Sequence, residues 1–71
     1  MTTFQTVFAE VRALKDSLRQ SRGTLVGIEC KQGLFAVTET RTEGRKSITE
    51  RLTSYMSHGE CVQVMREMAN G

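Results

Sequence analysis

Several residue types are scarce or absent in this 71-residue sequence, and each absence excludes a class of protein. There is no proline, no tryptophan, one histidine, and no apolar stretch long enough to span a bilayer. The only cysteines, Cys30 and Cys61, form no CxxC pair and are too few for a disulfide scaffold, so we expect reduced, buried thiols. The first residues resemble neither a signal peptide nor a transit peptide. The sequence therefore predicts a cytoplasmic protein that does not enter a membrane.

The length and composition predict a single small domain over residues 1–71. Hydrophobic residues make up 38% and charged residues 25%, with a net charge of +2, which excludes a disordered tail or a collagen-like repeat. For a chain of this size, burial of apolar area at ~25 cal/mol/Å² roughly offsets the conformational entropy of folding. Because a lone domain would be marginally stable, we expect self-association or partner binding to add to its stability.

Apolar residues three and four apart predict an amphipathic helix over about residues 4–20. Thr2 or Thr3 would cap its start, with Gln5 as the capping-box partner of Thr2, and Gly23 would end it in a left-handed conformation. The stripe consists of Phe4, Val7, Phe8, Val11, Leu14 and Leu18.

The segment from Thr24 to Arg41 is rich in β-branched and aromatic residues and reads as a hairpin. With Gln32 and Gly33 at the centre of the turn, Cys30 pairs with Phe35 and Ile28 with Val37, so these large apolar residues share one face. The other face is mostly small or polar, as expected for a solvated sheet surface, and holds Leu25, Gly27, Glu29, Ala36, Thr38 and Thr40.

Residues 47–56 follow a second turn at Glu43–Gly44 and fit two patterns. Ile48, Leu52 and Met56 have a helical spacing, but β-forming residues after a tight turn favour a third strand, which we prefer because an isolated hairpin supports a helix poorly.

A second capping box, formed by Ser57 and Glu60, predicts a C-terminal helix. Its apolar stripe consists of Cys61, Val64, Met65 and Met68. The predicted fold is therefore α+β, in the order α-β-β-β-α, with both helices on one face of a three-stranded antiparallel meander.

The same element order occurs in the double-stranded RNA-binding domain, so the two segments that touch RNA in that family were compared. Here the first turn is Lys31-Gln32-Gly33 and the last helix opens Ser57-His58-Gly59-Glu60. Neither matches that family's Gly-Pro-x-His loop or Lys-Lys-x-x-Lys cluster. The similarity is one of topology alone, and no family or functional residue follows from it.

No pattern of catalytic residues is present. His58 and Cys61 lie three residues apart at the start of the last helix, where the helix dipole lowers a thiol pKa, but the helical spacing favours a core role for Cys61 and a solvated His58. A zinc site from His58, Cys61, Cys30 and a carboxylate lacks the paired spacing of zinc modules. We therefore expect no enzyme activity, no cofactor, no metal and no small-molecule substrate.

Basic residues around the second hairpin offer a nucleic-acid surface. Thr38, Thr40 and Thr49 would lie beside them, although the charges from residue 23 to the C-terminus cancel and leave the excess at the end of the first helix. The candidate contacts are Arg41, Arg45, Lys46 and Arg51.

Three apolar residues that the predicted fold leaves at the surface offer a protein interface instead. Leu25 and Leu34 point outward from the hairpin, and Val62 lies off the stripe of the last helix, which is rich in adaptable methionine. Our interpretation is a small regulatory protein of bacterial, phage or mobile-element type that binds a protein partner or forms a homodimer. The alternative is a nucleic-acid-binding module that uses the second hairpin.

Overall fold

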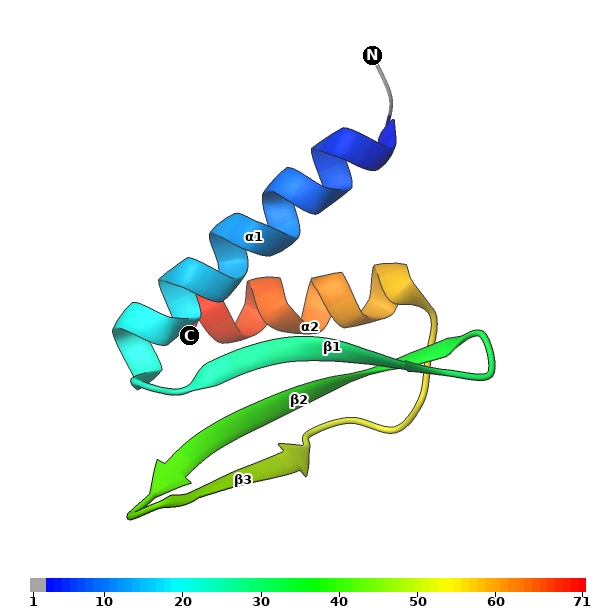
Figure 1. Cartoon of the computed structure of the whole chain (residues 1–71). Coiled ribbons are helices and arrows are strands. Elements are labelled where there is room, and N and C mark those ends of the chain that lie inside the picture. Colours follow the sequence, from blue (N-terminus) through cyan, green and yellow to red (C-terminus); the bar gives the residue numbers. More distant parts are fainter. Residues whose placement is uncertain (1–2) are drawn as a thin grey trace.

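The computed structural model describes residues 3–71, with side chains from Phe8 onward, and has the predicted order α-β-β-β-α (Figure 1). The antiparallel sheet has the strand order β1-β2-β3, and both helices pack on one of its faces. The predicted caps at Thr2, Thr3 and Gln5 lie outside the described side chains. The elements are α1 (Thr3–Arg22), β1 (Leu25–Lys31), β2 (Leu34–Glu43), β3 (Lys46–Arg51) and α2 (His58–Asn70).

The first hairpin has the predicted register. Cys30 lies opposite Phe35 and Ile28 opposite Val37. The turn residues Gln32 and Gly33 have φ values of 52° and 79°, the left-handed conformation that suits a tight turn between twisted strands. This register directs Val37 toward the helices and the alternate residues of β1 and β2 away from them.

The third strand is shorter than predicted. Its turn is centred on Gly44 and Arg45, one residue later than expected, and the strand ends at Arg51. The register Thr38↔Arg51 would place Ser54 opposite Phe35, but Met56 lies there instead. The extra residues fit because the Thr53 hydroxyl, not a backbone carbonyl, accepts the Val37 N–H at 3.1 Å. Residues 52–57 are therefore irregular rather than strand or helix.

The C-terminal helix begins with the predicted capping box. The Glu60 N–H donates to the Ser57 hydroxyl at 3.2 Å, and the Glu60 carboxylate accepts the Ser57 N–H at 3.1 Å. Cys61 and Met65 are fully buried. Val62, expected at the surface, is only 4% exposed, so the buried face of α2 is wider than the predicted stripe.

The core lies between the C-terminal half of α1, α2 and the first two strands. Leu18, Val26, Val37, Cys61 and Met65 form its buried cluster. Among the stripe residues of α1 whose side chains are described, Leu14 and Leu18 pack in or against this cluster, whereas Phe8 and Val11 lie on the part of the helix that extends beyond the sheet and α2 (Figure 1). The protein is consequently elongated, with extents of 43 × 28 × 21 Å.

Candidate interaction surfaces

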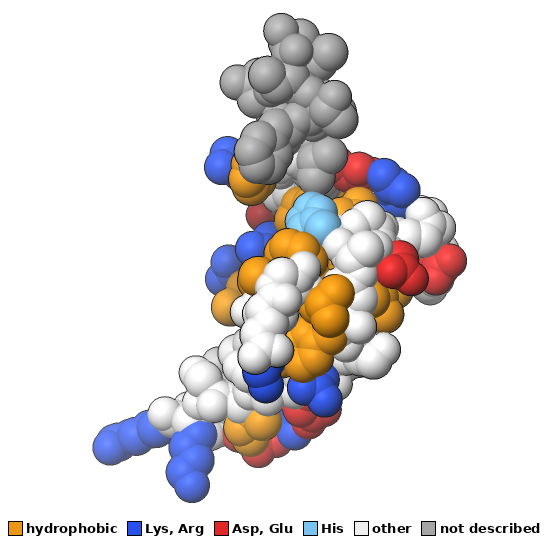
Figure 2. All heavy atoms as spheres, turned by 90° about the vertical axis from the view of Figure 1, so that its right-hand side faces the viewer, with side chains coloured by type: hydrophobic (Ala, Val, Ile, Leu, Met, Phe, Trp, Pro, Cys, Tyr) orange, Lys and Arg blue, Asp and Glu red, His pale blue; other side chains and the backbone are white. Residues whose placement is uncertain are grey.

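Described residues of the first half of α1 border an apolar groove. Phe8, 64% exposed, and Val11 face Ile28, Phe35 and the exposed Cys30 across a depression of about 230 Å³. Lys15 and His58 complete the lining, and we call this surface the apolar groove. Figure 2 shows the single histidine, in pale blue, with hydrophobic side chains beside it.

His58 has an apolar role in this groove. Its ring meets Phe35 edge to face, with centroids 5.1 Å apart and planes at 79°. This geometry is favourable for aromatic pairs and holds the imidazole against the end of the sheet. The prediction of a solvated His58 is therefore only partly correct, because the residue is half-buried.

The two thiols lie in different environments. Cys61 is fully buried, as predicted, and burial raises the pKa of its thiol, with a smaller contribution from the charge of Glu60. Cys30 is exposed, so the expectation of a buried thiol is wrong at this position, which lies at the end of β1 beyond the buried cluster. Neither cysteine forms a disulfide. Within residues 3–71, no group of three or more His, Cys, Asp or Glu is placed to hold a metal ion.

The side of the sheet opposite the helices is the second surface, which we call the open sheet face. It consists of alternate strand residues beginning with Leu25 in β1, Leu34 in β2 and Ser47 in β3. Hydroxyl side chains fill its centre, and those of Thr40 and Thr49 are hydrogen-bonded at 2.8 Å. The hydroxyl residues are Thr38, Thr40, Thr42, Ser47 and Thr49.

The structure does not bring the four predicted nucleic-acid contacts together. Arg51 lies on the open sheet face, its guanidinium 4.8 Å from the centre of the Tyr55 ring. Arg41 and Lys46 belong to the opposite, helix side of the sheet, and Arg45 sits in the turn. The lowest part of Figure 2, where Figure 1 places this turn, carries projecting basic side chains.

Arg41 is already engaged by neighbouring carboxylates. It donates to Glu43 at 3.3 Å and to Glu50 at 2.5 Å, and these hydrogen bonds raise the pKa of its guanidinium. An arginine held by two carboxylates must give up part of this pairing to bind a phosphate, so the hairpin is a weaker phosphate site than its sequence indicates.

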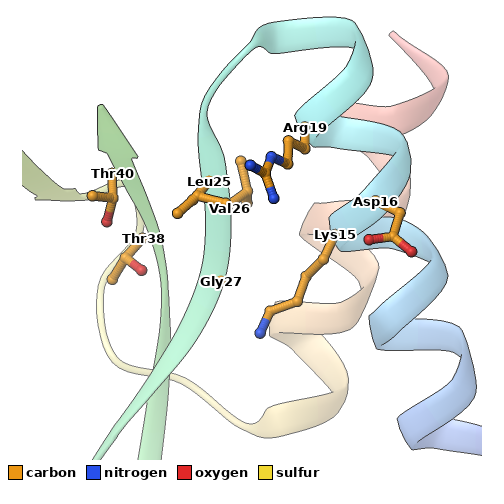
Figure 3. A pocket seen from close by; sticks show the side chains of 8 residues that line it. All are labelled: Lys15, Asp16, Arg19, Leu25, Val26, Gly27, Thr38 and Thr40. Carbon is orange, nitrogen blue, oxygen red and sulfur yellow. The ribbon is translucent and has the colours of Figure 1, made fainter. Parts of the chain in front are cut away.

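A basic cleft lies instead where α1 passes the edge of β1 (Figure 3). Its volume is about 290 Å³, and its lining contains two cations and one carboxylate from α1, namely Lys15, Arg19 and Asp16, together with Leu25, Val26, Gly27, Thr38 and Thr40 of the strands. A Cβ on Gly27 would lie 3.6 Å from Lys15 Cε and 4.0 Å from Thr38 Oγ1, so the lysine chain passes directly over the glycine. Sequence reasoning placed α1 correctly on the other side of the sheet but gave no sign that the Lys15 side chain would lie against Gly27 and Thr38 at the edge of β1.

The three predicted protein-contact residues are also dispersed. Leu25 and Leu34 are 53% and 48% exposed, as expected for the open sheet face. They stand at opposite ends of the β1–β2 ladder, however, roughly 20 Å apart at about 3.3 Å per residue. Val62 is buried on the helix side. These residues therefore form no continuous apolar patch.

Comparison with protein-family models, curated proteins and solved structures finds no match for this chain. Neither α1, as far as it is described, nor α2 is long and apolar enough to cross a membrane. The candidate functions accordingly rest on the apolar groove and the open sheet face.

Proposed function

We propose that this chain is a cytoplasmic protein that acts by binding rather than by catalysis, and that it associates with a second copy of itself through the apolar groove. The observation that carries the proposal is the large exposed fraction of Phe8, which together with Val11 lines the apolar groove.

The total exposed area of the chain is larger than that of a compact monomer, which favours a partner without locating it. The chain exposes 5240 Å², whereas a compact monomer of its 8.0 kDa mass would expose about 4,450 Å². The surplus of roughly 800 Å² equals about the area that each partner buries in an interface of standard size. The radius of gyration is 12.5 Å, whereas a compact chain of this length would have about 11 Å, so it also indicates a shape less compact than that of a typical monomer.

The arrangement of the surface favours a second copy over an unrelated partner. A two-fold interface uses the same patch on both subunits, so that patch must contain both a projection and a recess. Phe8 supplies a large exposed ring, and the groove between α1 and the ends of β1 and β2 supplies the recess. Two copies related by a two-fold axis would each insert Phe8 toward the groove of the other.

Light scattering after size exclusion, over a micromolar concentration series, tests this proposal. We expect the wild type to approach twice the chain mass and Phe8→Glu to remain a monomer, because the buried charge would oppose association. The matched control is Leu34→Glu, which places the same charge at an exposed leucine of the open sheet face and should leave the mass unchanged.

Two results would overturn the proposal. A wild-type chain that stays monomeric throughout the series would exclude self-association at these concentrations. Dissociation by Leu34→Glu but not by Phe8→Glu would move the contact to the open sheet face. Circular dichroism of both variants shows that they remain folded, as expected because neither residue belongs to the buried cluster.

A further inference from the structure

Most of the carboxylates on the strands lie on the helix side of the sheet. The carboxylates of Glu39, Glu43 and Glu50 all lie on the helix side. There Glu39 accepts a hydrogen bond from Arg22, and the other two accept hydrogen bonds from Arg41. The open sheet face has one strand carboxylate, Glu29, and this group accepts the Tyr55 hydroxyl. The helix side therefore holds three carboxylates together with Arg41 and Lys46, whereas the strand positions of the open sheet face hold Glu29 together with Lys31 and Arg51.

The cations beside the open sheet face remain available. Among the residues that the structure describes, Lys15 and Arg19 form no ion pair, although the carboxylate residue Asp16 lines the same cleft. Their side chains extend from α1 toward β1 and line the same cleft as Thr38 and Thr40 (Figure 3). Arg19 also lines an adjoining recess of about 370 Å³ beside Thr42 and Ser47. The hydroxyl side chains of the open sheet face therefore lie beside two cations, Lys15 and Arg19, that form no ion pair among the described residues.

This combination suits phosphate more than it suits protein. Lysine, arginine, serine and threonine supply the side-chain contacts by which proteins hold the nucleic-acid backbone. A protein interface needs a central cluster of apolar or aromatic anchors, which this face lacks, because Leu25 and Leu34 stand at its two ends. Repeated hydroxyls along the strands fit a ligand with repeated phosphates better than a single anion.

The surroundings of Tyr55 indicate whether a nucleic acid on this face would be contacted at its bases or at its backbone. The Lys31 ammonium lies 5.7 Å and the Arg51 guanidinium 4.8 Å from the ring centre. Stacking of a base on this ring would displace a cation, and no second aromatic residue belongs to the strand positions of this face. Contact is therefore with the backbone, without the base stacking that single-strand-binding sheets use.

We infer that the open sheet face binds the sugar-phosphate backbone of double-stranded nucleic acid, with Lys15, Arg19 and Thr38 holding a phosphate in the cleft at the β1 edge. Arg51 provides a further cation on the same face. Three cation contacts correspond to a slope of about −3 for the logarithm of affinity against the logarithm of salt concentration. Binding is consequently weak at physiological salt and independent of sequence.

Fluorescence anisotropy of a labelled mixed-sequence DNA duplex, repeated over a salt series, provides the test. The double variant Arg19→Gln/Thr38→Val removes one cation and one hydroxyl from the cleft, and we expect its Kd to rise several-fold and its salt slope to become shallower by about 1. The matched control Arg45→Gln/Ser54→Ala removes one cation at the hairpin turn and one exposed hydroxyl outside the strands. It should shift the Kd much less, by the loss of one distant charge.

The cleft is refuted if both double variants weaken binding equally, or if the hairpin variant weakens it more. Absence of duplex binding at low salt would overturn the inference entirely. Two competitors define the ligand class. Displacement of DNA by polyglutamate at equal charge would show that the surface binds polyanions in general. A tighter complex with the separated single strand would show that bases stack on the protein. Either result contradicts a backbone-specific duplex site. Neither double variant changes a residue of the apolar groove, so their difference in Kd reports on the cleft even though Lys15 lines both surfaces.

Discussion

The hydroxyl of Tyr55 donates a hydrogen bond of 2.5 Å to the carboxylate of Glu29 and so joins the segment after β3 to β1, across the strand between them. Ala36, the partner of Glu29 in the β1–β2 register, is fully buried, although the sequence predicts it on a solvated face. Residues 52–57 therefore cover one end of the open sheet face and leave its threonine-rich part accessible.

Replacement of this tyrosine measures how strongly the irregular segment is fixed. Tyr55→Phe keeps the ring but removes the donor, and we expect the free energy of unfolding to fall by about 1 kcal/mol, at the lower end for a hydrogen bond to a charged group because both residues are only half-buried. Urea denaturation followed by circular dichroism measures the change.

Thr42→Val is the control, since it removes an exposed hydroxyl of the same face for which the described chain shows no partner. Its stability should stay within about 0.5 kcal/mol of the wild type. Equal losses in the two variants would show that the hydrogen bond between Tyr55 and Glu29 contributes nothing specific.

Local sequence signals predict most of the fold because each acts over a few residues. The turn at Gln32–Gly33 fixes the register of β1 and β2, and the Ser57–Glu60 pair fixes the start of α2. The end of β3 cannot be predicted in the same way. It depends on Thr53, whose hydroxyl accepts the hydrogen bond from the Val37 N–H in place of a backbone carbonyl. The spacing of apolar residues in the sequence does not predict this substitution.

The candidate surfaces are less predictable because they depend on which face each charge occupies. Counting charges along the chain places Glu39 and Glu50 beside the basic hairpin, whereas the register turns both toward the helices. The same register leaves Arg51 on the open sheet face and Arg41 behind it. The side chain of Lys15 crosses β1 at Gly27, where a Cβ would lie in ordinary van der Waals contact with it, and no sequence pattern predicts this crossing.

Acidic pH should destabilise the fold through Glu39. Hydrogen bonds from Arg22 and then Thr24 hold the pKa of this carboxyl below its ordinary value of 4.5. Because the folded pKa is the lower one, the stabilisation is complete above the unfolded value and is lost as the pH falls from about 4.5 through the folded pKa. Glu10, paired with Arg66, and Glu60, in the capping box, have lowered pKa values too and act in the same direction.

Glu39→Gln should therefore lower the free energy of unfolding by about 1 kcal/mol at neutral pH, which is less than for a buried ion pair because Arg22 is 41% exposed. The variant should also lose less stability than the wild type as the pH falls. Thermal unfolding from pH 7 to pH 3 measures both effects. Glu67→Gln serves as the comparison, since Glu67 is exposed and forms no ion pair within the described chain. A loss of stability at low pH that is the same in both variants would contradict this role of Glu39.

The two thiols should differ in reactivity by their burial. Cys30 is exposed and should be alkylated in the native protein, whereas Cys61 is fully buried, its thiol pKa raised by that burial, and should react only after unfolding. Mass spectrometry of peptides after iodoacetamide treatment, with and without denaturant, distinguishes the two sites. Native modification of Cys61 would show that α2 opens without global unfolding.

The rate at Cys30 also depends on association, because this thiol lines the apolar groove. If two copies cover the groove, alkylation of Cys30 should slow as the protein concentration rises through the dimer Kd, and Phe8→Glu should abolish that dependence. Leu34→Glu should retain it, since Leu34 lies on the other face of the sheet. A rate that does not change with concentration, in a chain that light scattering shows to be dimeric, would place the interface away from the groove.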